Sequence, residues 1–143
     1  MTEQSFEKLL SANDVGATGS HQAGILVPKG NVELLTFFPL LDVKEKNPDA
    51  WITCEDEGGQ EWQLRYIYYN SRIHGLGTRN EFRLTHLTKF LKRNNAKVGD
   101  VLRFTATTTL GKYTLAIVSV ASPIVDHSLP SGVVRLSGWR RVH

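Results

Sequence analysis

Alternating and clustered hydrophobic positions predict a chain built mainly of β-strands. Residues 61–69 carry large apolar side chains at every second position, so one side of this strand is expected to face the core. The glycine pair at 58–59 lies just before it and predicts a hairpin with a preceding strand at 51–54. Further runs rich in apolar and β-branched residues predict strands at 23–28, 101–109 and 112–120.

Three shorter segments have helical patterns. Residues 4–10 carry three apolar side chains at the i, i+3, i+4 spacing of one helical face. Asn31 is a suitable N-cap for a second helix, which Pro39 is expected to end. Thr85 is the expected N-cap of a third helix within residues 84–95, which has basic residues in its last turn.

Together these elements indicate a mainly β (α+β) chain with six or more strands and two or three short helices. The 143 residues correspond to the size of one domain, so residues 1–143 are expected to form a single unit. Closing such a sheet into a barrel would remove the exposed strand edges that favour aggregation.

Charge is distributed unevenly along the chain. Residues 1–60 contain four Lys or Arg and ten Asp or Glu, a net charge of −6. Residues 61–143 contain 13 Lys or Arg and four Asp or Glu, a net charge of +9. The basic second part predicts a polyanionic partner, with an ordinary patchy surface as the alternative.

Several classes of protein are not expected. Cys54 is the only cysteine, which excludes an internal disulfide framework and zinc sites built on paired cysteines, and its place in a predicted strand favours a buried, unreactive thiol. No apolar run approaches the roughly 20 residues of a membrane span. The first ten residues lack the pattern of a signal peptide. We therefore expect a cytoplasmic chain that makes no membrane contact.

No catalytic or metal-binding pattern is complete. Metal-dependent nucleases often combine Pro-Asp with a downstream Asp/Glu-x-Lys. Here Pro48–Asp49 is followed by Glu81-Phe82-Arg83, and arginine cannot replace lysine as a base. Nucleophile-elbow and P-loop motifs are absent, and the five histidines have no recognisable metal-ligand spacing. We expect no catalytic residue and no metal site, with a small metal-dependent nuclease as the enzymatic alternative.

Two polar loops, residues 13–22 and 70–83, are the candidate binding sites. They contain side chains that can form paired hydrogen bonds with base edges in the major groove, where arginine suits guanine, asparagine or glutamine suits adenine, and a carboxylate suits cytosine. The alternative is that the loops are hydrated turns. The candidates are Asn13, Asp14, His21 and Gln22 in the first loop and Asn70, Arg72, Arg79, Asn80, Glu81 and Arg83 in the second.

The residues around both loops resemble a known family. Residues 10–30 (LSANDVGATGSHQAGILVPKG) and 68–85 (YYNSR followed by GTRNEFRLT) are similar to the two DNA-contacting segments of the N-terminal effector domain of EcoRII-type restriction endonucleases. These two segments, together with WQLRYIYYN and KVGDVLRF, are also similar to the plant B-three transcription-factor domain. The resemblance runs from about Lys8 to Phe104 and includes several ordered motifs at matching distances.

The resemblance implies an open, seven-stranded DNA-binding pseudobarrel flanked by two or three short helices. Two arms, residues 14–22 and 72–83, would grip the major groove. DNA-contacting positions of the endonuclease domain align with His21 in the first arm and with Arg79, Glu81 and Arg83 in the second. The arms also include the polar candidates Thr18, Ser20 and Thr78. Gly77 and Phe82 stand where the family's contact run has lysines, so the family's DNA target is not carried over.

The resemblance therefore predicts a sequence-specific domain that binds double-stranded DNA and belongs to a prokaryotic Type II restriction endonuclease. The catalytic domain is expected to be absent from this chain. As an isolated domain the chain is expected to be a monomer without a cofactor, and Mg²⁺ is expected only for a covalently linked nuclease domain. A stand-alone transcriptional regulator of the plant type is the other DNA-binding alternative.

Overall fold

The structure, a computed structural model, describes residues 4–16, 24–119 and 138–142. These residues form one eight-stranded sheet in the order β2-β5-β4-β3-β7-β6-β1-β8. Neighbouring strands are antiparallel except β3 and β7, which are parallel. The strands are β1 (Ser5–Leu9), β2 (Ile25–Val27), β3 (Asp49–Glu55), β4 (Glu61–Tyr69), β5 (Glu81–Thr85), β6 (Val101–Ala106), β7 (Lys112–Val118) and β8 (Trp139–Arg141). The helices are α1 (Val32–Phe37) and α2 (Thr88–Arg93).

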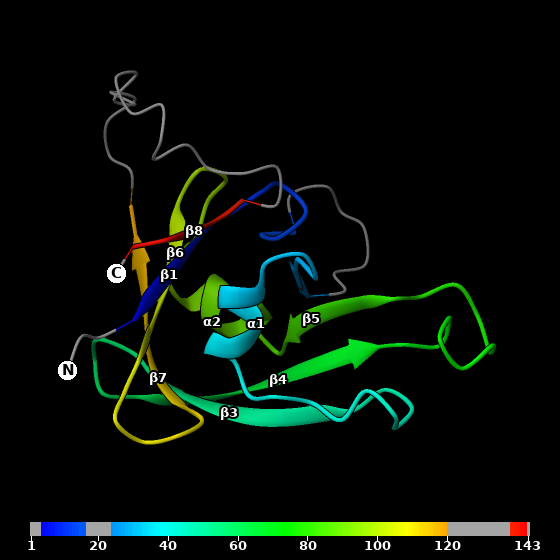
Figure 1. Ribbon diagram of the computed structural model, residues 1–143. Coiled ribbons are helices and arrows are strands. Elements are labelled where there is room, and N and C mark those ends of the chain that lie inside the picture. Colours follow the sequence, from blue (N-terminus) through cyan, green and yellow to red (C-terminus); the bar gives the residue numbers. More distant parts are fainter. Residues whose placement is uncertain (1–3, 17–23, 120–137, 143) are drawn as a thin grey trace.

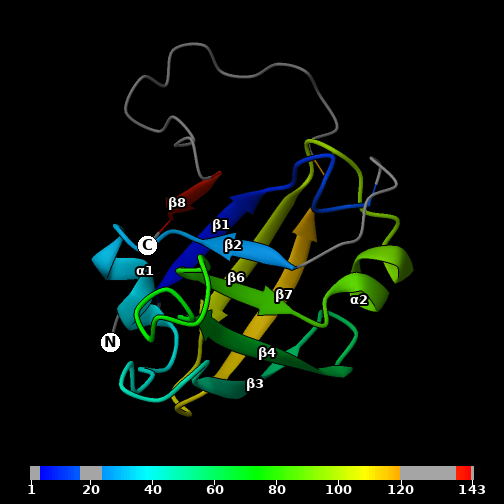
Figure 2. The same ribbon diagram turned by 90° about the vertical axis from the view of Figure 1, so that its right-hand side faces the viewer.

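The sheet curls until its two edge strands meet. Trp139 on β8 donates its indole N–H to the Leu26 carbonyl oxygen on β2 at 2.8 Å, although β2 and β8 are at opposite ends of the strand order. The strands wrap around a common interior (Figure 1), with α1 and α2 on opposite sides of it (Figure 2). The predicted mainly β pseudobarrel with short helices is confirmed, with eight strands in place of seven.

Aromatic side chains fill this interior. The ring of Phe38 lies 5.1 Å from that of Tyr66, 5.6 Å from that of Phe104 and 6.2 Å from that of Trp139, measured between ring centroids. All four side chains are almost completely buried. Burying one such ring stabilises a fold by roughly 1.5–3 kcal/mol, so this cluster is a main source of stability.

Helix α1 is defined by its two ends. The Asn31 side-chain oxygen accepts a hydrogen bond from the Leu34 backbone N–H at 3.0 Å, which confirms the predicted N-cap. The helix ends at Phe37, two residues before Pro39. Tyr113 on β7 donates its hydroxyl to the Phe37 carbonyl oxygen at 2.6 Å, which satisfies an acceptor at the end of the helix and ties α1 to the sheet.

The β3–β4 hairpin and β5 carry the second predicted loop. Asp56 accepts hydrogen bonds from two backbone N–H groups of the hairpin turn and from the Trp62 indole, all at 2.9 Å, and the predicted turn is confirmed. Strands β4 and β5 are antiparallel, and the loop of residues 70–80 between them projects away from the barrel (Figure 1).

The helix predicted for residues 4–10 is wrong, because these residues form β1 between β6 and β8. The first four residues of the strand, Ser5 to Lys8, are all buried. A strand between two neighbours can bury consecutive residues on both of its faces, whereas an amphipathic helix buries only one stripe. Strand β8 lies in a part of the chain for which no element was predicted.

The prediction that Thr85 caps a helix is also wrong. Thr85 is the last residue of β5, and α2 begins at Thr88 after Leu87, which makes no side-chain capping hydrogen bond. Pairing with β4, in which Thr85 lies opposite Arg65, extends the strand through the capping position. Glu81 and Arg83, which were expected in a loop, are therefore on β5, where alternate side chains point to the same face.

Candidate nucleic-acid interface

The loop of residues 70–80 is anchored by a buried asparagine. Asn70 is completely buried; its side-chain oxygen accepts from the Asn47 backbone N–H at 2.8 Å, and its amide donates to the Glu45 and Val43 carbonyl oxygens at 2.7 and 3.2 Å. A side chain that uses its hydrogen bonds inside the protein is not available to DNA. The prediction of Asn70 as a DNA contact is therefore corrected, and Asn70 positions the loop.

Backbone hydrogen bonds close this loop on itself. The Arg72 N–H donates to the Arg79 carbonyl oxygen at 2.9 Å, and the Leu76 N–H donates to the Ser71 carbonyl oxygen at 2.8 Å. Three of the predicted site residues, Arg72, Thr78 and Arg79, are exposed on this closed loop. The loop therefore presents their side chains to solvent on a backbone whose shape is already set.

One carboxylate joins two arginines where the loop meets β5. Glu81 Oε1 accepts from Arg79 Nε at 3.1 Å, and Oε2 lies 2.8 Å from Arg83 Nη2. Burial alone would raise the pKa of Glu81, but the hydrogen bonds and charges of Arg83 and Arg79 outweigh burial and lower it. The carboxylate is therefore ionised at neutral pH and holds both guanidinium groups beside it.

Aromatic side chains orient the polar groups of the same region. The Arg79 guanidinium carbon lies 3.7 Å from the centre of the Tyr69 ring, which is the geometry of a cation–π contact. The rings of Tyr68 and Phe82 stack with centroids 4.2 Å apart. The Tyr68 hydroxyl donates to the Asn80 side-chain oxygen, so the direction in which the Asn80 amide points is set by the protein.

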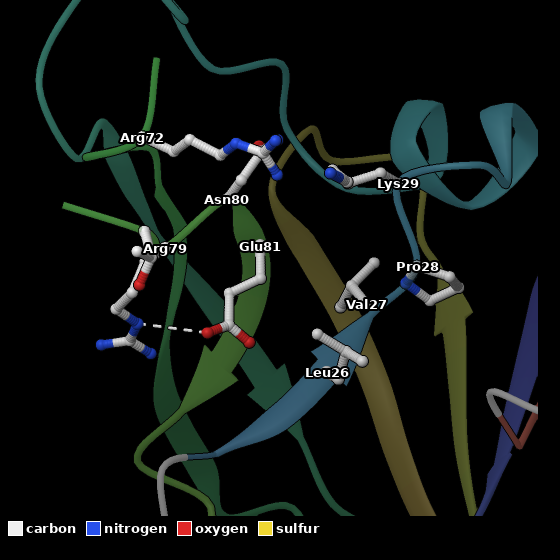
Figure 3. A pocket seen from close by; sticks show the side chains of 9 residues that line it. Leu26, Val27, Pro28, Lys29, Arg72, Arg79, Asn80 and Glu81 are labelled. Carbon is white, nitrogen blue, oxygen red and sulfur yellow. Dashed lines mark hydrogen bonds and ion pairs between the residues drawn. The ribbon is translucent and has the colours of Figure 1, made fainter. Parts of the chain in front are cut away.

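A pocket of about 450 Å³ lies between the end of β2 and the loop. Figure 3 shows Lys29 and Arg72 pointing into it from opposite sides, with the Arg79–Glu81 ion pair at its edge. Its lining residues are Leu26, Val27, Pro28, Lys29, Arg72, Thr78, Arg79, Asn80 and Glu81. The pocket brings together five of the predicted site residues and one lysine that was not predicted.

The outer faces of β3, β4 and β5 carry a second set of polar and aromatic side chains. Arg65 pairs with Asp49 at 2.6 Å across the β3–β4 hairpin. Trp51, which is half exposed, makes an edge-to-face contact with His86, with ring centroids 4.8 Å apart. Arg83 also donates to the Gly24 carbonyl oxygen at 3.0 Å, so its side chain ties β5 to the start of β2.

The first predicted arm is described only at its start. Asp14 is buried, and its carboxylate accepts from Lys8 Nζ and from the Ser11 backbone N–H, both at 2.9 Å. The prediction of Asp14 as a DNA contact is therefore corrected, because its charge is neutralised inside the protein. Asn13 is exposed beside it. Thr18, Ser20, His21 and Gln22 lie outside the described residues.

The first loop leads into β2 at one end of the β2–β5 pair, and the second loop leads into β5 at the other end. Gly24, which follows the first loop, lies beside Leu84, and a Cβ atom on it would come within 2.4 Å of the Leu84 carbonyl oxygen. Its φ of +90° also favours glycine. The second loop instead enters β5 at Glu81, close to the end of β2. The outer face of β5, with Arg83 in the middle, therefore lies between the attachment points of the two loops.

The described residues contain neither a cluster of metal ligands nor an exposed thiol. Cys54 is completely buried, as predicted, and burial raises the pKa of its thiol to about 12. In residues 4–16, 24–119 and 138–142, no three His, Cys, Asp or Glu side chains are grouped closely enough to hold a metal ion. None of the helices in these residues has the length and apolar character needed to span a membrane.

Sequence reasoning missed Lys29. Lys29 follows Pro28 in the acidic first part of the chain, and its position suggested only the approach to a helix. The pairing of β2 with β5 brings it opposite the second loop, 43 positions before Arg72 in the chain. Lys29 lies near the end of residues 10–30, which resemble a DNA-contacting segment, but neither that resemblance nor a lysine next to a proline specifies its neighbours.

Known proteins with similar sequences place the chain in a family. Residues 2–106 match the family model described as restriction endonuclease EcoRII, N-terminal. The chain belongs to this family. Type II restriction enzyme EcoRII from Escherichia coli is 47% identical over 83 residues, which cover 56% of this chain and 20% of that enzyme. The AP2/ERF and B3 domain-containing transcription factor RAV1 from Arabidopsis thaliana is 29% identical over 102 residues, which cover 71% of this chain and 26% of RAV1.

Solved structures show the same fold as this member of the EcoRII N-terminal family. The Arabidopsis FUS3–DNA complex aligns with a TM-score of 0.58 and 20% identity, covering 79% of this chain and 94% of that one. The N-terminal domain of Helicobacter pylori LlaJI.R1 aligns with a TM-score of 0.54 and 16% identity over 98% of both chains. By contrast, the matched segments make up only 20% of EcoRII and 26% of RAV1, so these relatives are several times longer than the match.

Proposed function

We propose that this chain binds double-stranded DNA in a sequence-specific manner, with the two loops as arms in the major groove. The observation that carries the proposal is the arrangement around Glu81, where one carboxylate and the Tyr69 ring hold the exposed Arg79 fork in place. A guanidinium in a fixed orientation can donate to guanine O6 and N7 together, which is the commonest specific contact in the major groove. Membership of the EcoRII N-terminal family supports the same function.

The candidate contacts separate into two groups. Arg72, Thr78, Arg79 and Asn80 line a pocket open to solvent, and Glu81 and Arg83 lie on the adjoining strand. In the first arm, Asn13 stays a candidate, and Thr18, Ser20, His21 and Gln22 stay predictions from the family resemblance. Asn70 and Asp14 support the loops from within, as their buried hydrogen bonds indicate.

Within a whole protein, we propose that the chain is the target- or effector-recognition part of a restriction endonuclease. The higher identity to EcoRII than to RAV1 favours this context over that of a plant-type regulator. Cleavage and its Mg²⁺ would then belong to a covalently linked nuclease domain. The isolated chain is proposed to act as a monomer in the cytoplasm.

A nuclease active site within this chain is less well supported. The two carboxylates nearest to a nuclease pattern are Asp49, which pairs with Arg65, and Glu81, which pairs with Arg79 and Arg83. Carboxylates that are neutralised by arginines are poor ligands for a divalent cation. We therefore assign this chain a binding role.

Selection of random-sequence duplexes by the purified chain tests the proposal directly. A single enriched motif, bound much more tightly than a scrambled duplex of the same length, is the expected result. No enrichment after repeated rounds would overturn the sequence-specific function. A parallel incubation with plasmid DNA and Mg²⁺ is expected to leave the plasmid intact, and cleavage by the purified chain would favour the nuclease alternative.

A further inference from the structure

The cations around the pocket differ in whether a carboxylate neutralises them. Arg79 and Arg83 share Glu81. Lys29 and Arg72 also carry positive charges, but among the residues that the structure describes no carboxylate pairs with either of them. Both side chains point into the same pocket from opposite walls (Figure 3). The pocket therefore holds two positive charges that are not balanced within the described part of the protein.

The hydrogen-bonding groups of the pocket are mainly donors. Lys29 and Arg72 can only donate. The Asn80 side-chain oxygen already accepts from Tyr68, and both Glu81 oxygens already accept from arginines. The major-groove edge of a whole base pair presents both donors and acceptors, whereas a phosphate presents only acceptors. The pocket therefore matches a phosphate better than it matches a base.

The wall of the pocket formed by the end of β2 and by Pro28 is apolar. Leu26, Val27 and Pro28 line it, and Leu26 is 40% exposed although it is a large hydrophobic side chain. An apolar wall beside a cluster of donors is complementary to a sugar–phosphate unit, because deoxyribose offers C–H groups next to an anionic phosphate. A volume of about 450 Å³ is sufficient for one such unit.

We propose that this pocket holds one backbone phosphate of the bound DNA between Lys29 and Arg72, with its deoxyribose against Leu26 and Pro28. The inference rests on the proposed function and adds Lys29 to it as a positioning contact. Phosphate contacts set the register of a protein on a duplex without reading bases. A phosphate fixed here sets the position from which the neighbouring Arg79 reaches the base edges.

The first experiment compares Lys29→Gln and Arg72→Gln with Lys112→Gln. Lys112 is a matched control because it starts β7 beside Glu61, at the end of β4 that is remote from the loop of residues 70–80. Each pocket variant is expected to weaken binding several-fold on both the selected and the scrambled duplex. The slope of log K against log salt should become shallower by about 0.9 in each pocket variant, and Lys112→Gln should change neither quantity.

The second experiment identifies the phosphate itself. Duplexes of the selected sequence carry one uncharged methylphosphonate at each backbone position in turn. One position is expected to weaken binding by the wild-type chain and to have no further effect on Lys29→Gln, because the charge partner is already missing. If a methylphosphonate at every position weakens binding by the wild-type chain and by Lys29→Gln to the same extent, the pocket holds no phosphate and the inference is overturned.

The failure of this inference is distinguishable from failure of the proposed function. If the wild-type chain selects no duplex, the proposed function fails. If the wild-type chain binds a selected duplex and the pocket variants keep its affinity and salt slope, only the phosphate pocket fails. Unchanged thermal unfolding midpoints for both variants are expected, since neither side chain forms an ion pair with a described residue.

Discussion

Trp139 donates its indole N–H to the Leu26 carbonyl oxygen at 2.8 Å, across 113 positions of the chain. The hydrogen bond joins the last strand of the sheet to the first, and Leu26 also lines the candidate phosphate pocket. Residues matched by the family model end at 106, so β7 and β8 lie outside the match although both belong to the same sheet. The C-terminal strand is therefore part of the unit that positions the pocket.

Replacement of Trp139 tests this closure. Trp139→Phe keeps most of the buried ring and loses the hydrogen bond, so the free energy of unfolding should fall by about 0.5–1.5 kcal/mol. Trp139→Ala should lower it by about 3–5 kcal/mol, because a cavity is left in the core. Urea unfolding measures both values. The half-exposed Trp51 provides the control, and a loss as large in Trp51→Phe as in Trp139→Phe would contradict the closing role.

Gly24→Ala tests the close approach of β2 to β5. The new Cβ atom would lie 2.4 Å from the Leu84 carbonyl oxygen, at a φ of +90° that disfavours alanine. The free energy of unfolding should fall by about 1–3 kcal/mol, measured in urea. Gly30→Ala is the matched control, because no atom lies within 4 Å of its Cβ position. Equal stability of the two variants would mean that β2 is free to shift away from β5.

Arg79→Lys separates charge from shape at the second arm. Lysine keeps the positive charge but cannot donate two parallel hydrogen bonds to guanine. Binding to the selected duplex should weaken by about 1–3 kcal/mol, with little change on a scrambled duplex. Fluorescence anisotropy at one salt concentration measures both affinities. Arg93→Lys, on α2, is the control, and equal losses on the two duplexes would make Arg79 a phosphate contact.

Glu81→Gln removes the charge that holds the two arginines and keeps the shape of the side chain. Binding to the scrambled duplex should become tighter, because repulsion between the carboxylate and DNA phosphates is lost. The ratio of selected to scrambled affinity should shrink, because Arg79 and Arg83 are no longer held by the carboxylate. Parallel titrations measure the ratio. An unchanged ratio would remove Glu81 from the residues that determine specificity, and Glu61→Gln is the control at the other end of β4.

Glu7 predicts a pH dependence of stability. Its carboxylate is buried on β1 and pairs with Arg103 at 2.5 Å and Arg140 at 2.8 Å. Burial alone would raise the pKa of Glu7, but the hydrogen bonds from Arg140 and Arg103 outweigh burial, and the pKa lies below its usual value of 4.5. Because the folded state favours the ionised form, this contribution is complete above the unfolded-state pKa and is lost as the pH falls through the lowered pKa.

The measurement is the free energy of unfolding between about pH 7 and pH 3 for the wild-type chain and for Glu7→Gln. Near neutral pH the wild-type chain should have a larger free energy of unfolding than Glu7→Gln. The difference between the two proteins should narrow as the solution becomes acidic. Glu57→Gln, in the exposed hairpin turn, should follow the wild-type curve. A difference between wild type and Glu7→Gln that does not depend on pH would contradict the assigned ion pairs.

Local patterns in the sequence were sufficient for several elements. The alternation over residues 61–69 matches the bounds of β4, because a strand with one buried face needs apolar side chains at every second position. Asn31 caps α1 because its side chain reaches a backbone N–H three residues ahead. The loop between β4 and β5 was located from its turn residues, its charge and its family resemblance, all of which are read over a short stretch of chain.

Tertiary structure alone decided the features that depend on distant segments. Residues 4–10 have a helical pattern, yet pairing with β6 and β8 makes them a strand, since each neighbouring strand supplies hydrogen bonds that a six- or seven-residue helix cannot match. Asn70 became an anchor and Lys29 a pocket residue only because the loop of residues 43–47 and β2 fold against the second arm. Sequence patterns indicate which side chains have the chemistry to bind a partner. Burial and pairing between distant strands determine which of those side chains are exposed where a partner can contact them.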